Sequence, residues 1–237
     1  MPAFIVSQPA LFGHPEPIGF GDEALSVRLI NRDDANSIIR RNHYSRTVSQ
    51  NSLEHLGVFI GSDMVGVLQW GYAMNPASGA SIVPGLTTGR WRELNRMWVD
   101  DVAPRNTESR AISYSIKLLR RRVPGLAMLQ SFADERCGGL GVVYQACSFG
   151  YYGEHTSTFW ELDGVVYHNI AMTVKEPERA GRIKAAHLQA NRDRAVRMDL
   201  RQFRYLRFLS SAAEKACTLS RQPYPKRHTH PLLAEPL

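Results

Sequence analysis

The sequence predicts a mixed α/β fold in which helices flank a central sheet. Short segments with alternating apolar and polar residues, typical of half-buried strands, are interspersed with segments whose apolar residues recur every three or four positions. Hydrophobic residues make up 43% of the 237 residues, which is enough to bury a sizeable core. No apolar run approaches the ~20 residues of a membrane span, and the first residues do not resemble a signal peptide. We therefore expect no membrane partner.

The N-terminal half is expected to begin irregularly and then to alternate strands with one helix. Residues 1–24 are rich in proline and glycine, which interrupt regular structure. Asn31, followed by acidic residues, is typical of a helix N-terminus. The turn Gly61-Ser62-Asp63 joins two apolar runs into a hairpin. The expected elements are a strand at 25–30, a helix at 31–42, a hairpin of 56–60 and 64–72, a loop at 75–90 and a strand at 91–99.

The C-terminal half continues the same alternation before its composition changes. Asn106 or Thr107 is expected to cap a helix that ends before Pro124. A strand at 126–133, a helix at 142–147 and strands at 149–152, 159–162 and 165–168 follow. Residues 1–175 are thus predicted to form the catalytic domain, and residues 176–237 a basic helical C-terminal extension with one long helix over about 179–209.

The positive charge of the chain lies in its last segment. Residues 1–175 contain 16 Lys and Arg against 16 Asp and Glu, whereas residues 176–237 contain 13 against 6, so the net charge of +7 belongs to the extension. Such a segment suits an acidic partner, most simply nucleic acid, although it could also act only on solubility. The basic residues expected to contact DNA are Arg197, Arg201 and Arg204 on one helix face, with Lys226 and Arg227 near the end.

The order of these elements resembles the GNAT acyltransferase fold, in which an acyl donor enters between two splayed strands. Tyr144, followed five residues later by Phe149, resembles the late helix motif whose tyrosine protonates the leaving group. The glycine-rich coenzyme A loop of that family is missing, because residues 100–108 contain no glycine. Arg105, Asn106 and Thr107 at the helix N-terminus could still hold a phosphate.

Several strings of residues, spread over about residues 40–227, together resemble the Mom family of bacteriophage proteins. The resemblance implies a DNA-modifying transferase that converts adenine to its carbamoylmethyl derivative on the exocyclic amine and so protects phage DNA from host restriction enzymes. It also implies double-stranded DNA as partner and the cytoplasm of the infected bacterium as location. The strings are Asn42-His43-Tyr44-Ser45, Glu93-Leu94-Asn95-Arg96, Asn106-Thr107-Glu108-Ser109, Ser131-Phe132-Ala133-Asp134, Gly141-Val142-Val143-Tyr144-Gln145-Ala146 and Tyr224-Pro225-Lys226-Arg227.

Within this resemblance, the candidate catalytic residues have distinct expected roles. His43 would accept protons, and its alternative role is a capping or core histidine. Arg96, on an apolar strand, needs a partner such as Asp134 or a substrate carbonyl. Tyr44 would polarise the carbonyl with Arg96, Ser131 would lend a hydroxyl, and Asp134, at a strand end, would orient His43 or Arg96. A metal, with iron as the candidate, could be held by His43, Tyr44 and Asp134 instead.

The sequence is compatible with more than one acyl donor and more than one class of reaction. The added group has the atoms of glycine, so glycyl-tRNA or a coenzyme A thioester could supply it, and tRNA is then a second partner. The competing reading is an acetyl-CoA-dependent N-acetyltransferase that acts on a small molecule or a protein. A third is a DNA-binding module without catalysis. An adenine methyltransferase is disfavoured because Asn75-Pro76-Ala77 lacks the second proline and the aromatic residue of the methyltransferase motif.

Overall fold

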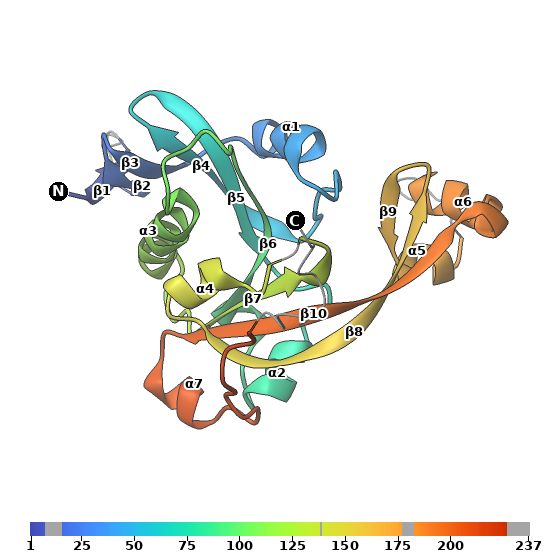
Figure 1. Cartoon of the computed structure of the whole chain (residues 1–237). Coiled ribbons are helices and arrows are strands. Elements are labelled where there is room, and N and C mark those ends of the chain that lie inside the picture. Colours follow the sequence, from blue (N-terminus) through green and yellow to red (C-terminus); the bar gives the residue numbers. More distant parts are fainter. Residues whose placement is uncertain (8–15, 138, 177–182, 227–237) are drawn as a thin grey trace, which may run out of the picture.

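Strands from both halves of the chain join in one mixed sheet. The computed structural model describes residues 1–7, 16–137, 139–176 and 183–226 (Figure 1). The sheet has ten strands in the order β1-β2-β3-β4-β5-β6-β7-β10-β8-β9. The strands are β1 (Ala3–Val6), β2 (Pro17–Asp22), β3 (Leu25–Leu29), β4 (Ser52–Ile60), β5 (Asp63–Gly71), β6 (Trp91–Val99), β7 (Met128–Asp134), β8 (Gly150–Leu162), β9 (Val165–His168) and β10 (Val196–Phe208).

Helices connect the strands and cover both faces of the sheet. The two longest are α1 and α3, and short 3-10 turns stand beside three of the strands. The helices are α1 (Arg32–Asn42), α2 (Ser78–Ile82), α3 (Thr107–Arg122), α4 (Val142–Ala146), α5 (Asn169–Thr173), α6 (Ile183–Ala190) and α7 (Ser211–Lys215), and the turns are η1 (Thr88–Arg90), η2 (Glu135–Cys137) and η3 (Arg192–Arg194).

The main helices lie on opposite faces. Leu68 packs in the large core beneath α3, whereas its neighbour Val67 packs in a separate cluster with Ala35 and Ile39 of α1. Because successive side chains of a strand point to opposite faces, α1 and α3 must cover opposite sides of the sheet. In the α3 core, the indole nitrogen of Trp70 donates to Ser115 Oγ at 3.0 Å.

The two central strands separate soon after they meet. Strands β6 and β7 are the parallel pair of the sheet, and their pairing covers only Trp91–Glu93 against Met128–Gln130. Both strands continue beyond that point, β6 to Val99 and β7 to Asp134. The sheet therefore opens into a wedge whose closed end is marked by Glu93.

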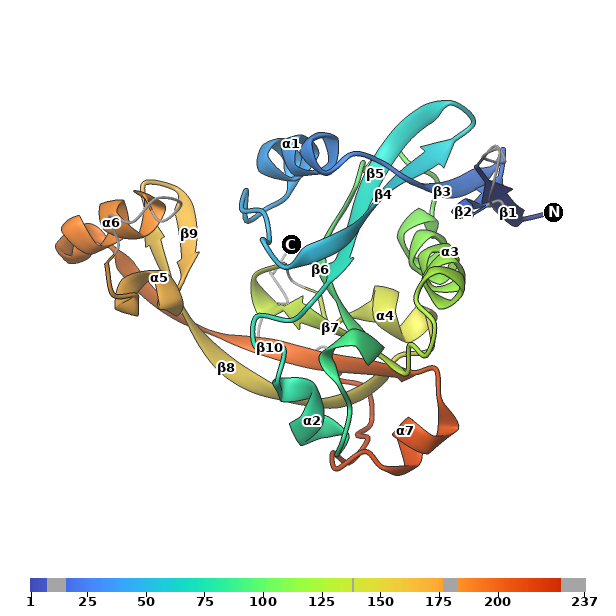
Figure 2. The same ribbon diagram turned by 180° about the vertical axis from the view of Figure 1, so that it is seen from behind.

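A long arm projects from this sheet. The inner part of β10 pairs with both β7 and β8, but Val196–Arg201 pairs with β8 alone. We call the described residues of 156–201 the arm; it carries β9, α5 and α6 at its far end, and both views show it reaching outward on the side away from β1, β2 and β3 (Figures 1 and 2). Leu162, Tyr167 and Leu188 form its own small core.

The structure confirms the predicted mixed α/β class and most elements between Leu25 and His168. The predicted loop at 75–90 contains α2 and η1, and the strands predicted at 149–152 and 159–162 are one continuous strand, β8. Two further predictions are wrong. The lead-in contains β1 at the edge of the sheet and β2 beside it, with an edge-to-face contact of Phe4 and Phe20 between them. The predicted long helix ends at Ala190, and Val196–Phe208 is a strand of the central sheet.

The error in the C-terminal segment has a physical reason. Val196, Leu200 and Phe203 have helical spacing, but Phe203 and Tyr205 also alternate with Arg204, and both of these aromatic residues are buried. Pairing with β7 and β8 satisfies the backbone and decides between the two periods. The segment predicted as an extension thus supplies a central strand. No helix in the described part of the chain has the length and apolar character needed to cross a bilayer.

Candidate active site

The loop after α1 meets the end of β7 at a shared carboxylate. Tyr44 Oη donates a hydrogen bond to Asp134 Oδ2 at 3.3 Å. The guanidinium of Arg136, in η2, donates to both oxygens of the same carboxylate, with Nε at 3.1 and 3.0 Å. Burial opposes the ionisation of Asp134, but the hydrogen bonds and charge of Arg136 outweigh it and lower its pKa. Asp134 is therefore ionised and is positioned by two neighbours.

His43 is buried beside this carboxylate and is a poor base. The backbone N–H of Ser45 donates to His43 Nδ1 at 3.1 Å, which assigns the ring proton to Nε2. Burial, with the nearby charges of Arg96 and Arg136, lowers the pKa of His43 to about 3. Its ring lies 4.3 Å from the ring of Tyr44, centroid to centroid. The neutral imidazole thus supports Tyr44 and can donate a hydrogen bond from Nε2, but it does not fit the expected role of proton acceptor.

Arg96 holds the loop that carries His43 and Tyr44. Its Nε donates to the carbonyl of Thr47 at 2.7 Å, and its Nη1 to the carbonyl of Asn95 at 2.6 Å. Burial lowers the pKa of Arg96. The partners of this side chain are therefore main-chain carbonyls, where the sequence suggested Asp134 or a substrate.

The remaining predicted catalytic residues, Ser131 and Tyr144, lie on the other face of the sheet. Ser131 alternates with Asp134 along β7 and lies between two residues of the α3 core. Its hydroxyl is fully buried and has no hydrogen-bond partner within the described residues. Tyr144 Oη is 3.5 Å from the carbonyl of Phe132, beyond the point where β6 and β7 separate. Tyr144 thus borders the wedge from the α4 side.

A buried carboxyl group closes the wedge. Gln130 Nε2 donates to Glu93 Oε2 at 2.7 Å, and burial raises the pKa of Glu93. The guanidinium of Arg204 lies over the ring of Phe132 at 5.5 Å, and its charge acts on Glu93. Sequence reasoning missed Glu93, although it stands in one of the quoted strings.

The three side chains expected as metal ligands gather, but their arrangement does not fit a metal ion. Both oxygens of Asp134 accept from Arg136, and the positive charges of Arg96 and Arg136 already act on His43. A cation at Asp134 would be repelled by the positive charges of Arg96 and Arg136. Within the described residues, no group of three His, Cys, Asp or Glu side chains could hold a metal. Iron is therefore not supported at this site.

The residues expected to bind the donor stand at the start of α3. Asn106 is the N-cap, with a left-handed φ of 68°, and Thr107 Oγ1 donates to the carbonyl of Pro104 at 2.5 Å. Thr107 is buried and its hydroxyl already donates to the Pro104 carbonyl, whereas the side chains of Arg105 and Asn106 are exposed. Their contact with a donor phosphate stays a prediction.

The arginines expected to contact DNA have partners of their own. Arg197 pairs with Asp199 at 3.1 Å, and Arg201 pairs with Glu135 at 2.8 Å and Glu154 at 3.5 Å. Arg204 lies on the opposite face of β10, which separates it from the other two. Lys226 is exposed, and Arg227 lies outside the described residues.

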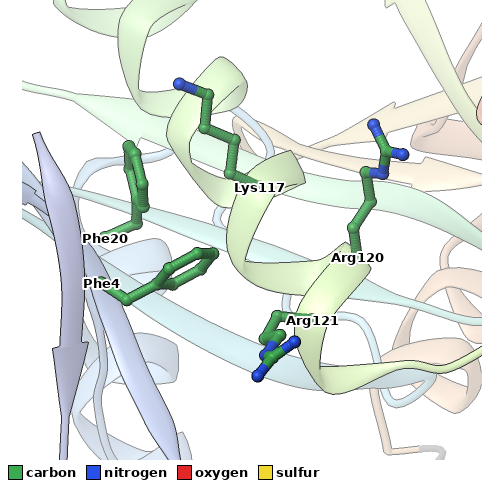
Figure 3. Close-up of a pocket in the computed structure, with 5 residues that line it drawn as sticks. All are labelled: Phe4, Phe20, Lys117, Arg120 and Arg121. Carbon is green, nitrogen blue, oxygen red and sulfur yellow. The ribbon is translucent and has the colours of Figure 1, made fainter.

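Besides Glu93, the structure adds two residues that sequence reasoning did not select, Arg136 and Phe159. The guanidinium carbon of Arg136 lies 4.5 Å from the ring centroid of Phe159 in β8 and 5.1 Å from that of Tyr44. Arg136 follows Asp134 closely, so the acid–base pair at a strand end was a usable signal. Phe159 comes from the arm, and nothing in the sequence around it indicates a functional role. The surface hollow in Figure 3, lined by Phe4, Phe20, Lys117, Arg120 and Arg121, contains none of the predicted site residues.

Comparison with known proteins agrees with the resemblance seen in the sequence. The model of the Mom protein family matches residues 24–226. A protein named methylcarbamoylase mom, from Escherichia phage Mu, is 50% identical over 212 residues, which cover 88% of this chain and 87% of that protein.

Solved acetyltransferase structures align with lower similarity. The ribosomal-protein-S5-alanine acetyltransferase from Vibrio fischeri has a TM-score of 0.47 and 12% identity, over 82% of this chain and 98% of that one. The spermidine N-acetyltransferase from Vibrio cholerae has a TM-score of 0.46 and 11% identity, over 81% and 99%.

Proposed function

The chain belongs to the Mom protein family, and we propose that it is a DNA methylcarbamoylase. It converts adenine in DNA to its carbamoylmethyl derivative on the exocyclic amine and so protects phage DNA from restriction in the bacterial host. The observation that carries this proposal is the 50% identity with the Mu phage methylcarbamoylase over 88% of the chain. The cluster of Tyr44, Asp134 and Arg136 supports it, because it offers an ionised carboxylate beside aromatic rings.

Asp134 is the group best placed to bind the amine of adenine. Its carboxylate is ionised and accepts hydrogen bonds, which matches the N–H donors of an exocyclic amine. His43 is neutral with its free N–H on Nε2, so it orients Tyr44 and can donate to a carbonyl oxygen. Arg96 keeps both residues in place through the Thr47 carbonyl.

The wedge offers the acyl donor a path from the opposite face. Tyr144 borders the wedge near the Phe132 carbonyl, where its phenol can protonate a leaving oxygen or sulfur. The donor would be glycyl-tRNA or a glycyl thioester of coenzyme A, held at the α3 N-terminus. Loss of activity after ribonuclease treatment of the donor mixture identifies the first, and dependence on added coenzyme A the second.

The reaction has two steps. The adenine amine attacks the glycyl carbonyl, the ester or thioester bond breaks, and the proton of the amine passes to the leaving group. The free glycyl amine then attacks C6 of the ring and the bond from C6 to the original nitrogen breaks. The proton that the attacking amine loses passes to that nitrogen, which becomes the terminal amide. If adenine labelled with heavy nitrogen on its amine gave product with the label still bound to the ring, this rearrangement would be wrong.

Mass spectrometry of nucleosides tests the proposed function directly. DNA from bacteria that express the protein should contain carbamoylmethyl deoxyadenosine, and DNA from cells expressing Asp134→Asn should not. Only unmodified deoxyadenosine, with folded wild-type protein present in the cells, would overturn the proposal. An acetyltransferase acting on a small molecule or a protein, or a DNA-binding module, would give that result.

A further inference from the structure

A flat side chain lies in a slot at the candidate active site. The guanidinium of Arg136 contacts the ring of Tyr44 from the α1 loop and the ring of Phe159 from the arm. The Asp134 carboxylate accepts two of its N–H groups at one edge. The slot therefore has aromatic walls and an acceptor for N–H donors.

Neighbouring rings support both walls. Tyr44 lies against His43 with an interplanar angle of 32°, and Phe159 makes an edge-to-face contact with His168 at 5.3 Å. Phe159 is 9% exposed, whereas Tyr44 is 54% exposed, so the slot is closed on the arm side and open to solvent on the Tyr44 side. The two rings are therefore already in place around the Arg136 guanidinium, and the Tyr44 side is the one from which a ligand could replace it.

Adenine shares the features by which Arg136 occupies the slot. It is flat, it stacks on aromatic rings, and its exocyclic amine carries N–H groups at one edge. An enzyme that reacts with that amine must turn the base out of the duplex. Guanine presents an oxygen acceptor at the same edge, which the carboxylate of Asp134 would repel.

We propose that the acceptor adenine, turned out of DNA, takes the place of the Arg136 guanidinium between Tyr44 and Phe159, with its amine donating to Asp134. The inference rests on the proposed function and identifies the binding subsite of its substrate. Arg136 is then a stand-in that leaves when the base enters, and Phe159 is a binding residue supplied by the arm.

Equilibrium binding to short duplexes tests this subsite without requiring catalysis. One position of the duplex carries an unpaired adenine, an unpaired guanine or an abasic site. Wild-type protein should prefer the adenine duplex by about tenfold over the abasic duplex, which is the range of one base stacked on an aromatic residue, and this is the preference that the variants test. The guanine duplex should also bind more weakly than the adenine duplex, because Asp134 repels the guanine oxygen. Phe159→Leu should reduce the preference to about one, and Phe159→Tyr should keep it.

Variants of Tyr44 test the same subsite in case Phe159→Leu does not fold. Tyr44 is exposed, so Tyr44→Leu should lose the preference without unfolding, whereas Tyr44→Phe keeps the ring and the preference. The matched control is Phe4→Leu, an exposed aromatic residue in the hollow of Figure 3, which should behave like wild type. Thermal unfolding confirms that each variant is folded.

The outcomes separate this inference from the proposed function. If folded Phe159→Leu and Tyr44→Leu keep the full preference for adenine, or wild-type protein has none, the subsite is wrong, while modified adenine in DNA still supports the function. If wild-type protein produces no modified adenine, the function fails whatever the duplexes show.

Discussion

The hydroxyl of Tyr44 lies 3.3 Å from Oδ2 of Asp134, although the two residues are 90 positions apart in the chain. This contact joins the loop after α1 to the end of β7. Arg136 donates to the same carboxylate. Asp134, a predicted catalytic residue, therefore holds both the ring of Tyr44 and the guanidinium of Arg136 at the site.

Asp134→Asn should abolish most of the modification while leaving the fold intact. The amide cannot act as an ionised acceptor for the adenine amine, so kcat should fall about 100-fold. Arg136 loses a charged partner, so the free energy of unfolding should fall by about 1–3 kcal/mol. Nucleoside mass spectrometry and urea unfolding measure the two effects. A variant with wild-type levels of modified adenine would show that Asp134 has no catalytic role.

His43→Asn should make the fold less sensitive to acid. The pKa of His43 falls from its ordinary 6.5 to about 3 on folding, so between these values the unfolded chain binds a proton that the folded protein does not. His43 therefore lowers stability as pH falls through this window, with a slope of up to about 1.4 kcal/mol per pH unit. Asparagine keeps an acceptor for the Ser45 amide.

Urea unfolding of wild type and His43→Asn on both sides of pH 6.5 measures this difference. Burial also lowers the pKa of His55, His155 and His168, but these contributions are common to both proteins. Parallel curves of stability against pH would contradict the buried, neutral state of His43.

Tyr144→Phe should lower kcat about 100-fold and leave KM for DNA unchanged. The hydroxyl of Tyr144 borders the wedge, away from the slot that binds the base, so its loss should affect only protonation of the leaving group. Single-turnover kinetics with saturating DNA measure the change. An equal loss in KM would place Tyr144 in substrate binding instead.

The sequence could predict site residues that have a local signal, but not contacts between segments that are far apart in the chain. Tyr44 and Asp134 were found because each stands at the end of a regular element, where polar residues are informative. The partner of Arg96 was not predictable, because the carbonyl of Thr47 is a main-chain atom reached by a loop. Nothing near Phe159 indicated that the arm would bring it to Arg136.

The fold was predictable where one period was dominant. The strand β5 has clear alternation and the helix α3 a clear apolar stripe, and both were expected at nearly these bounds, whereas β4 begins four residues before the predicted strand of 56–60. In β10 the apolar residues fit both the helical spacing and the alternation of a strand. Only pairing with β7 and β8 decides between the two structures. The separation of β6 and β7 depends on register, which no single segment encodes.

Gly141→Ala should destabilise the protein and disturb Tyr144. Gly141 has a φ of +70° and caps α4, and an added Cβ would lie 2.3 Å from Cε2 of the buried Tyr205. Either that ring or the start of α4 must shift, so unfolding free energy should fall by about 2 kcal/mol or more and kcat should also fall. Urea unfolding and nucleoside analysis measure both.

Gly85→Ala is the matched control for this substitution. Gly85 has a similar φ of +77°, but an added Cβ would have no atom within 4 Å. Its effect should be the backbone strain alone, about 1 kcal/mol, with unchanged activity. Equal losses for the two variants would show that strain, and not the contact with Tyr205, explains the effect at Gly141.

The salt dependence of DNA binding should identify the arginines that contact phosphate. Arg40 at the end of α1 and Arg46 after Tyr44 are exposed and form no ion pair within the described residues, whereas Arg201 is paired with Glu135 and Glu154. Each phosphate contact contributes about −0.9 to the slope of log K against log salt. Removing both Arg40 and Arg46 as alanines should therefore reduce the slope by about 2 in magnitude. Arg201→Ala should leave the slope unchanged. The reverse result would show that the acidic partners release Arg201 to DNA, as the charge of the C-terminal segment first suggested.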